Sequence, residues 1–308
     1  MSTLLLSHTA CFDHLTPDGH PERPDRLRAV EHALEDEMFA SLVREQAPEA
    51  ELETAALAHP QDYVEAIIAA APTDGLVRVD ADTSMSPGSL EALRRGMGAA
   101  TRAVDEVVTR NVRNAFCAIR PPGHHAEKVR AMGFCLFNFA AIAAIHARKT
   151  HGLERVAVVD FDVHHGNGTQ DIFWSEPELF YGSTHQMPLY PGSGARGETG
   201  VGNIVNAPLA PGDDGVAFRE AMDGVILPAL ERFSPDLVII SAGFDAHARD
   251  PLANLNLVED DFAWATRRLM EIAERTCDGR VVSVLEGGYD LVGLATSTAA
   301  HVRTLMEA

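Results

Sequence analysis

The stretch "RVAVVDFDVHHGNGTQ" (155–170) decides the expected fold, because an apolar, β-branched run ends in a crowd of acids and histidines. Its first half, "RVAVVDFD" (155–162), has the composition of a buried strand. A strand sends residues i, i+2 and i+4 to the same face, so Asp160, Asp162 and His164 should point the same way. Two carboxylates and one imidazole would then share a small volume at the end of a core strand.

Segments of the same kind recur along the chain and alternate with segments of helical periodicity. The other expected strands are "TLLLSH" (3–8), "NAFCAIR" (114–120), "LFYGS" (179–183), "LVIISAG" (237–243) and "RVVSVLEGG" (280–288). The expected helices span residues 23–37, 89–110, 137–149, 216–233 and 259–275. This alternation predicts an α/β fold with a central, mostly parallel sheet of about eight strands and helices on both faces. Ligands of such sheets bind beyond the carboxyl ends of the strands.

The composition is that of a globular protein, with 46% hydrophobic and 23% charged residues in a chain of 308. No repeat, low-complexity tract or long linker divides the chain, so residues 1–308 are expected to form a single domain. The net charge of −20 argues against binding to nucleic acid. It is compatible with attracting cationic substrates, although a solvated acidic surface is the simpler explanation.

Two features indicate a cytoplasmic protein that does not associate with membranes. The first residues, "MSTLLLSHTACFDH", contain only three consecutive leucines, and no apolar run approaches the length of a membrane span. The four cysteines are far apart and form no C-x-x-C pair, so they suggest neither a thiolate zinc site nor a disulfide framework. The oligomeric state stays open, because apolar surface patches cannot be located from a sequence.

Polar side chains gather at the ends of three more strands: His124 and His125 in "AIRPPGHHAEK", Asp245 in "SAGFDAH" and Tyr289 in "LEGGYD". The carboxyl ends of parallel strands lie on one edge of a sheet, so these side chains should converge with those of 160–164 on one pocket.

Asp162, His164 and Asp245 are the candidate metal ligands. Two carboxylates and one imidazole suit a hard or borderline divalent ion and leave a coordination position open for water and substrate. The alternative is that the acids cap neighbouring helices and that His164 is a satisfied core histidine. The gathering of polar side chains at four strand ends favours the metal.

Hydrolysis also needs groups that move protons. His124 and His125 are the candidates, with Asp160 and Asn167 as the residue types that hold the far ring nitrogens. Tyr289 could donate a hydrogen bond to a carbonyl oxygen as negative charge develops on it. Taken alone, the two histidines could lie on the surface after a Pro-Pro-Gly turn, and the tyrosine could be a packed turn residue.

With these residues in place, the sequence resembles the zinc-dependent histone deacetylase family, within the arginase/deacetylase fold. The resemblance extends over nearly the whole chain through "HPERPDRL" (20–27), "RPPGHHAEK" (120–128), "GFCLFN" (133–138), "DFDVHHGNGTQ" (160–170), "YPGSG" (190–194), "SAGFDAHARDPL" (241–252) and "LEGGYD" (285–290). The chain has Asn167 where class I members have Asp, and "EGGY" in place of "GGGGY". In these two features it resembles the class II branch, and it looks like a bacterial-type, single-domain member.

The resemblance implies one catalytic Zn²⁺ held by Asp162, His164 and Asp245. It implies Tyr289 as the carbonyl-polarising tyrosine and His125 as the general base and acid. His124 would be the electrostatic partner of His125, with Asp160 and Asn167 orienting the pair.

The family also implies a substrate tunnel and a structural K⁺. Gly133 and Phe134 match one wall of the tunnel, and Tyr190 stands where the family usually has the opposing Phe. The K⁺ would be held by backbone carbonyls, Asp160 and Ser183.

The function implied is removal of acetyl or related acyl groups from the lysine side chain in proteins or peptides. An acetylpolyamine amidohydrolase is the first alternative; related eukaryotic polyamine enzymes carry an acid at the position of Leu252, which cannot anchor a distal ammonium. A catalytically silent acyl-lysine binding module and a binuclear, arginase-like hydrolase rank lower.

Overall fold

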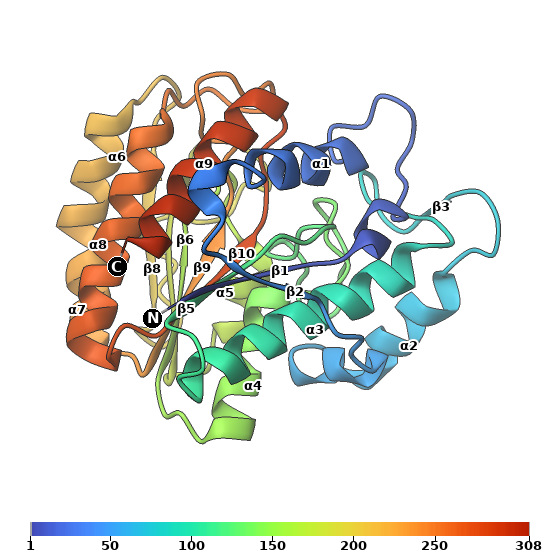
Figure 1. Cartoon of the computed structure of the whole chain (residues 1–308), viewed down its shortest axis with the longest axis horizontal. Coiled ribbons are helices and arrows are strands. Elements are labelled where there is room, and N and C mark those ends of the chain that lie inside the picture. Colours follow the sequence, from blue (N-terminus) through green and yellow to red (C-terminus); the bar gives the residue numbers. More distant parts are fainter. Residues whose placement is uncertain (1, 308) are drawn as a thin grey trace.

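The computed structural model describes residues 2–307, and its centre is one eight-stranded sheet with the order β2-β1-β5-β10-β9-β6-β7-β8 (Figure 1). Every pairing in this sheet is parallel. The strands are β1 (Thr3–Ser7), β2 (Val43–Gln46), β5 (Asn114–Cys117), β6 (Val156–Asp160), β7 (Leu179–Gln186), β8 (Ile204–Leu209), β9 (Leu237–Ala242) and β10 (Val281–Leu285). The predicted sheet of about eight strands is confirmed.

Helices cover both faces of the sheet (Figure 1). One layer contains α1 (Pro24–Ala33), α6 (Gly215–Ala221), α7 (Leu227–Phe233), α8 (Glu259–Cys277) and α9 (Leu291–Met306). The other contains α3 (Ser89–Val108), α4 (Phe139–His151) and α5 (Asn167–Phe173), and α2 (Gln61–Ala70) joins it through the 3-10 segment Leu52–Leu57. A small hairpin, β3 (Val77–Arg78) and β4 (Ser84–Met85), lies outside the sheet.

The central strands form because their apolar runs are buried on both faces. Every residue of β6, β9 and β10 is buried, as expected for strands between two helical layers. The helices end where the sequence provides caps: the Asn138 side chain accepts a hydrogen bond from the backbone N–H of Ala141 at the start of α4, and Gly152 ends α4 with φ 69°.

The decisive strand is shorter than expected, because β6 ends at Asp160 rather than at residue 162. Asp160 Oδ1 accepts a hydrogen bond from the backbone N–H of Asp162, and Asp162 Oδ1 accepts one from that of His164. These two bonds turn the chain locally and compete with strand pairing. Asp162 and His164 are therefore held by consecutive turns rather than by strand alternation.

Several elements lie outside the segments predicted from sequence: β2, β8, α2, α5 and α9. β2 is a largely exposed polar edge strand, and β8 carries Pro208 at the opposite edge, so neither has the apolar run of a central strand. The helix expected over 216–233 is divided by a π-helical turn at Met222–Ile226. No helix among residues 2–307 is long and apolar enough to cross a membrane.

The strand order places the functional motifs side by side. β5, β10, β9 and β6 are consecutive neighbours, and their carboxyl ends lead into the segments with His124, Tyr289, Asp245 and Asp162. The four motifs therefore meet at one edge of the sheet.

Candidate active site

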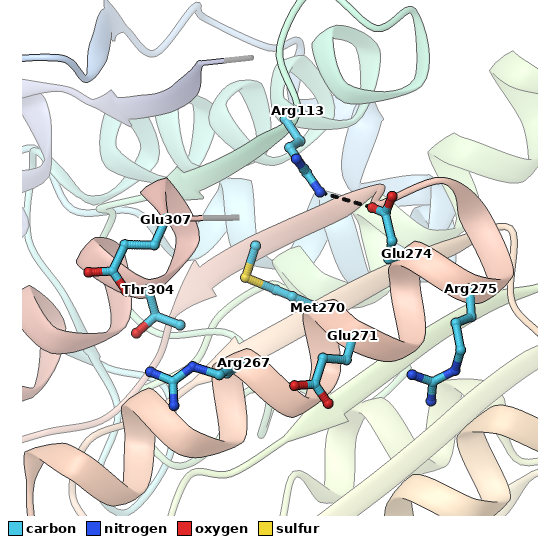
Figure 2. A pocket seen from close by; sticks show the side chains of 8 residues that line it. All are labelled: Arg113, Arg267, Met270, Glu271, Glu274, Arg275, Thr304 and Glu307. Carbon is cyan, nitrogen blue, oxygen red and sulfur yellow. Dashed lines mark hydrogen bonds and ion pairs between the residues drawn. The ribbon is translucent and has the colours of Figure 1, made fainter.

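One cavity, of about 500 Å³, lies away from the carboxyl edge of the sheet, between α8 and α9 near the start of β5 (Figure 2). It is lined by Arg113, Arg267, Met270, Glu271, Glu274, Arg275, Thr304 and Glu307. Basic and acidic groups are mixed there, and Arg113 pairs with Glu274 at 2.9 Å. None of the lining residues belongs to either group of potential metal ligands found among residues 2–307.

The three predicted metal ligands meet at the carboxyl edge of the sheet. Asp162 and His164 follow β6, and Asp245 follows the neighbouring β9. One ligand atom from each lies within 4.8 Å of the others, and all three residues are buried. His164 Nδ1 is 3.2 Å from Asp162 Oδ1 and 3.0 Å from Asp245 Oδ2.

The electrostatics of this group fit a divalent ion. Burial and the charge of Asp162 raise the pKa of Asp245 to about 7. Burial also opposes ionisation of Asp162, but His124 and His164 outweigh it and hold its pKa below the usual range. Although burial disfavours charged His164, its hydrogen bonds to the two carboxylates raise its pKa to about 10. A divalent cation would balance both carboxylates and leave the imidazole neutral, as a metal ligand must be.

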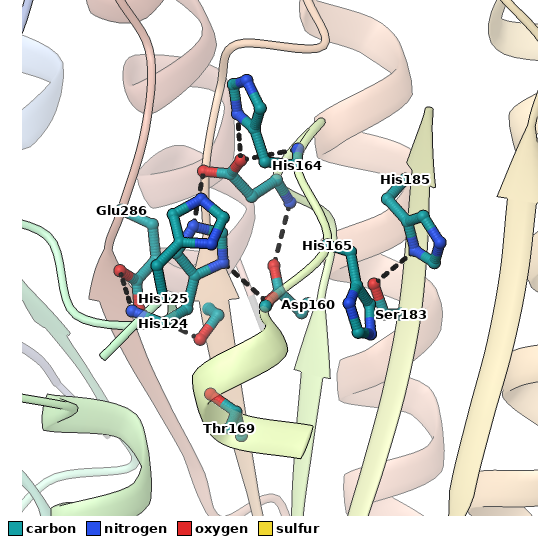
Figure 3. A network of polar contacts seen from close by, with 12 residues as sticks. His124, His125, Asp160, His164, His165, Thr169, Ser183, His185 and Glu286 are labelled. Carbon is teal, nitrogen blue, oxygen red and sulfur yellow. Dashed lines mark hydrogen bonds and ion pairs between the residues drawn. The ribbon is translucent and has the colours of Figure 1, made fainter. Parts of the chain in front are cut away.

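The two adjacent histidines lie beside this group with different partners (Figure 3). His124 Nδ1 is 3.0 Å from Asp160 Oδ2, and the charges of Asp162 and Asp160 overcome burial and raise the pKa of His124 well above its usual value. Burial and the charges of His124 and His164 hold the pKa of His125 well below its usual value. One histidine is thus kept charged and the other neutral.

Asn167 fixes the orientation of His125. Its Nδ2 donates to Glu127 Oε1 at 2.6 Å, which leaves Oδ1 to accept a hydrogen bond from His125 Nδ1 at 2.8 Å. His125 Nε2 then carries the lone pair, which is the state required of a general base. Asn167 itself is the first residue of α5, a helix that the sequence did not reveal.

A cavity of about 230 Å³ opens above these groups, lined by Asp82, His125, Gly133, Phe134, His164, Leu189, Tyr190, Leu252 and Tyr289. The three residues predicted to form the tunnel walls are among them, and so is Leu252, which was also expected at the tunnel. The Tyr190 ring is 40% exposed and lies edge-on to His125, with 5.2 Å between centroids. The lining therefore combines aromatic and aliphatic side chains with polar groups.

Tyr289 also lines this cavity and is held by contacts with three residues. Its backbone N–H donates to Asp250 Oδ2 at 2.7 Å, and its ring packs edge-on against Phe134 at 5.8 Å. The Arg26 guanidinium lies over the same ring, 4.8 Å from its centroid, and donates to the backbone carbonyls of Gly288 and Glu286. These contacts fix a phenol that lines the same cavity as His164.

Glu286 is a buried carboxylate whose role the sequence did not reveal. Its Oε2 accepts hydrogen bonds from the backbone N–H groups of Gly123 and His124 at 2.7 and 3.1 Å, and its Oε1 accepts one from the Ser241 hydroxyl at 3.1 Å. Burial raises its pKa to about 7. It joins the end of β10 to the segment that carries the histidine pair. The motif "LEGGYD" contained this residue, but only the folded loops show its partners.

Asp82 is a second residue that the sequence analysis missed. It comes from the segment before β4, lines the cavity, and accepts hydrogen bonds from the Gly133 backbone N–H and the Thr83 hydroxyl at 3.0 and 2.8 Å. Together with burial, its charge raises the pKa of Tyr190. The cavity therefore has an acid at its wall, although Leu252 is not one.

Asp160 and Ser183 are register neighbours on β6 and β7. Asp160 Oδ2 accepts a hydrogen bond from the Tyr181 hydroxyl at 3.0 Å in addition to its contact with His124. The Ser183 hydroxyl lies 2.9 Å from His185 Nδ1 (Figure 3). The two residues predicted to hold K⁺ are thus brought close together on adjacent strands.

Gly287 lies against both carboxylates of the candidate metal centre. A Cβ atom there would overlap Asp245 Oδ2 and Asp162 Oδ2. We therefore expect Gly287→Ala to displace both carboxylates and weaken Zn²⁺ binding by roughly 10- to 100-fold, the range seen when groups around metal ligands are changed. Competition with a chromophoric chelator measures this affinity.

The matched control is Gly197→Ala, because a Cβ atom at Gly197 would meet nothing within 4 Å. Equal Zn²⁺ affinities for the two variants would contradict the assignment of the carboxylates.

Both the sequence and the fold of the chain are similar to those of known proteins. The family model described as "Histone deacetylase domain" matches residues 20–305. The chain is 42% identical to the histone deacetylase-like amidohydrolase of Pseudomonas aeruginosa, over 88% of this chain and 73% of that protein. It is 39% identical to histone deacetylase 10, chloroplastic, of Oryza sativa subsp. japonica, over 94% of this chain and 70% of that protein. The solved structure of the HDA15 HD domain superposes with a TM-score of 0.94 at 35% identity and covers 99% of this chain and 88% of that one. The chain therefore belongs to the histone deacetylase family, whose deacetylase and amidohydrolase members are hydrolases.

Proposed function

We propose that this protein is a zinc-dependent deacetylase that removes acetyl or related acyl groups from lysine side chains in proteins or peptides. The observation that carries the proposal is the cavity of about 230 Å³, whose lining combines apolar and aromatic side chains with polar groups that can take part in hydrolysis. The first kind includes Phe134, Tyr190 and Leu252, and the second includes His125, His164 and Tyr289. Apolar and aromatic walls suit the four methylenes of a lysine side chain, while the rest of the peptide stays outside.

Asp162, His164 and Asp245 would hold the Zn²⁺. When bound, the ion supplies a Lewis acid and a coordinated water whose pKa falls to about 7. His125 Nε2 accepts the proton of the attacking water and later donates it to the departing amine, because Asn167 keeps its Nδ1 protonated. The charged His124 stabilises the negative charge that develops, and the Tyr289 hydroxyl donates to the carbonyl oxygen of the amide.

K⁺ is part of the proposal as a structural ion. The side chains of Asp160 and Ser183 and the backbone carbonyls near them would coordinate it at the ends of β6 and β7. Such an ion would stabilise the segment that carries the Zn²⁺ ligands.

An acetylpolyamine amidohydrolase is the second candidate, and Asp82 is the observation that favours it. A carboxylate at the cavity wall could bind the distal ammonium of a polyamine, which Leu252 cannot do. The net charge of −20 would favour the approach of such a substrate.

The test is a comparison of kcat/KM for an acetyl-lysine peptide and an acetylated polyamine, with Asp82→Asn alongside the parent enzyme. The lysine proposal expects the peptide to be preferred by both enzymes. The polyamine candidate expects the opposite preference, with at least a tenfold selective loss for the polyamine in Asp82→Asn, as for loss of a charge-assisted contact. Asp80→Asn is the matched control, since Asp80 pairs with Arg130 and does not line the cavity.

A gain of charge at Leu252 should move the preference in the same cavity. We expect Leu252→Glu to raise the polyamine-to-peptide ratio of kcat/KM roughly tenfold, because a carboxylate there would pair with a distal ammonium. Leu252→Gln, which has the same length without the charge, is the control. An unchanged ratio in Leu252→Glu would show that this position does not select the substrate.

A further inference from the structure

A second group of potential metal ligands lies between α3 and α4. Asp105 belongs to α3, whereas His146 and His151 belong to α4. One ligand atom from each of the three lies within 4.8 Å of the others. Asp105 Oδ1 is 2.7 Å from His146 Nε2 and 2.7 Å from His151 Nε2, so one carboxylate oxygen faces both imidazoles.

This group is separate from the candidate active site. His151 ends α4 shortly before the first residue of β6, and Asp105 lies near the end of α3, before β5 begins. Both strands start at the amino edge of the sheet, whereas the candidate catalytic groups follow the carboxyl ends. The two helices pack against each other (Figure 1).

We propose that Asp105, His146 and His151 form a second binding site for a divalent transition metal ion of the zinc type, one that links α3 to α4. Two imidazole nitrogens and a carboxylate oxygen are a donor set that such ions favour. The remaining coordination positions would be taken by water. The proposal goes beyond the proposed deacetylase function and does not depend on it.

The geometry requires only small movements to receive an ion. Ligand atoms about 2.0 to 2.2 Å from a tetrahedral ion are about 3.3 Å apart. The carboxylate oxygen of Asp105 is 2.7 Å from each Nε2, so it has to withdraw from each by about 0.6 Å, which side-chain rotation provides. The side chains of His146 and His151 are each 16% exposed and that of Asp105 is 38% exposed, so an ion can reach them from solvent.

Thr150 supports the metal-binding form of His146. The Thr150 hydroxyl is 3.2 Å from His146 Nδ1. When Nδ1 carries the proton and donates a hydrogen bond to this hydroxyl, Nε2 has a free lone pair on the side of Asp105. A partner on the far nitrogen is a usual feature of metal-bound histidines, because it orients the ring.

The experiment is equilibrium dialysis of the metal-free protein against micromolar free Zn²⁺, followed by measurement of bound zinc per chain. The parent protein is expected to bind two equivalents, and the double variant His146→Gln/His151→Gln one. Asp245→Asn, which disables the candidate catalytic centre, is expected to bind one, and the combination of all three substitutions none. His32→Gln is the matched control, because the exposed His32 side chain on α1 pairs with Glu35 and its replacement should leave two equivalents.

Two further measurements keep the test decisive. If the double variant His146→Gln/His151→Gln does not fold, Asp105→Asn takes its place, because it removes a ligand without changing α4. Asp105→Asn should also reduce the bound zinc from two equivalents to one. The double variant should keep its turnover on acetyl-lysine peptide, which separates this site from the catalytic one. One equivalent bound to the parent and none to Asp245→Asn would overturn the proposal, as would two equivalents bound to the folded double variant.

Discussion

We expect Tyr289→Phe to bind Zn²⁺ as the parent does and to hydrolyse an acetyl-lysine peptide roughly 10²- to 10³-fold more slowly, the usual cost of losing one donor to a developing oxyanion. Tyr289 lines the same cavity as His164. Asp250 holds its backbone, and Phe134 and Arg26 pack against its ring. These contacts do not involve the hydroxyl oxygen, so its removal should leave the loop in place. Steady-state kinetics and zinc content measure the two expectations.

Tyr190→Phe is the matched control for this variant. Tyr190 lines the same cavity, but its side chain is 40% exposed and reaches His125 with the ring rather than the hydroxyl. Turnover by Tyr190→Phe should fall less than tenfold. Parent-like turnover in Tyr289→Phe would exclude the phenol as the carbonyl's hydrogen-bond donor.

The second large effect is expected for His125→Ala, which should lose roughly 10²- to 10⁴-fold in kcat while keeping its zinc. Burial and the neighbouring charges keep His125 neutral, and Asn167 directs its proton to Nδ1, so Nε2 accepts a proton. Alanine removes this acceptor, and none of the groups that line the cavity replaces it in the same position.

His20→Ala provides the comparison, because His20 packs edge-on against Phe134 at 4.7 Å without reaching the candidate metal ligands. It should cost less than tenfold. If His125→Ala lost no more activity than His20→Ala, the proton would have to be transferred by another group.

Much of the candidate site could be predicted because an apolar run marks each buried strand, and because parallel strands all end at the same edge of the sheet. Asp162, Asp245, His124 and Tyr289 each follow an apolar run, so their meeting at one edge needed only the assumption of parallel strands. The error at β6 was also local. Asp160 and Asp162 bind the backbone two residues ahead and end the strand, and strand periodicity does not include such turns.

The parts that the sequence did not reveal depend on contacts between distant segments. Asp82 reaches the cavity because its side chain binds the Gly133 backbone, 51 positions further along the chain. Glu286 accepts hydrogen bonds from the backbone N–H groups of Gly123 and His124, and no sequence pattern near Glu286 predicts these partners. The group of Asp105, His146 and His151 also depends on distant segments, because Asp105 contacts His146 only when α3 packs against α4.

The most direct test of the account is turnover of an acetyl-lysine peptide by enzyme that has been stripped of metal with a chelator and then titrated with Zn²⁺. Asp162, His164 and Asp245 are buried together, and His164 lines the cavity. The stripped enzyme should therefore be inactive, and activity should return as the catalytic site fills with Zn²⁺. Asp245→Asn, treated in the same way, should stay inactive. Full turnover by the stripped enzyme, or recovery of Asp245→Asn with zinc, would contradict the account.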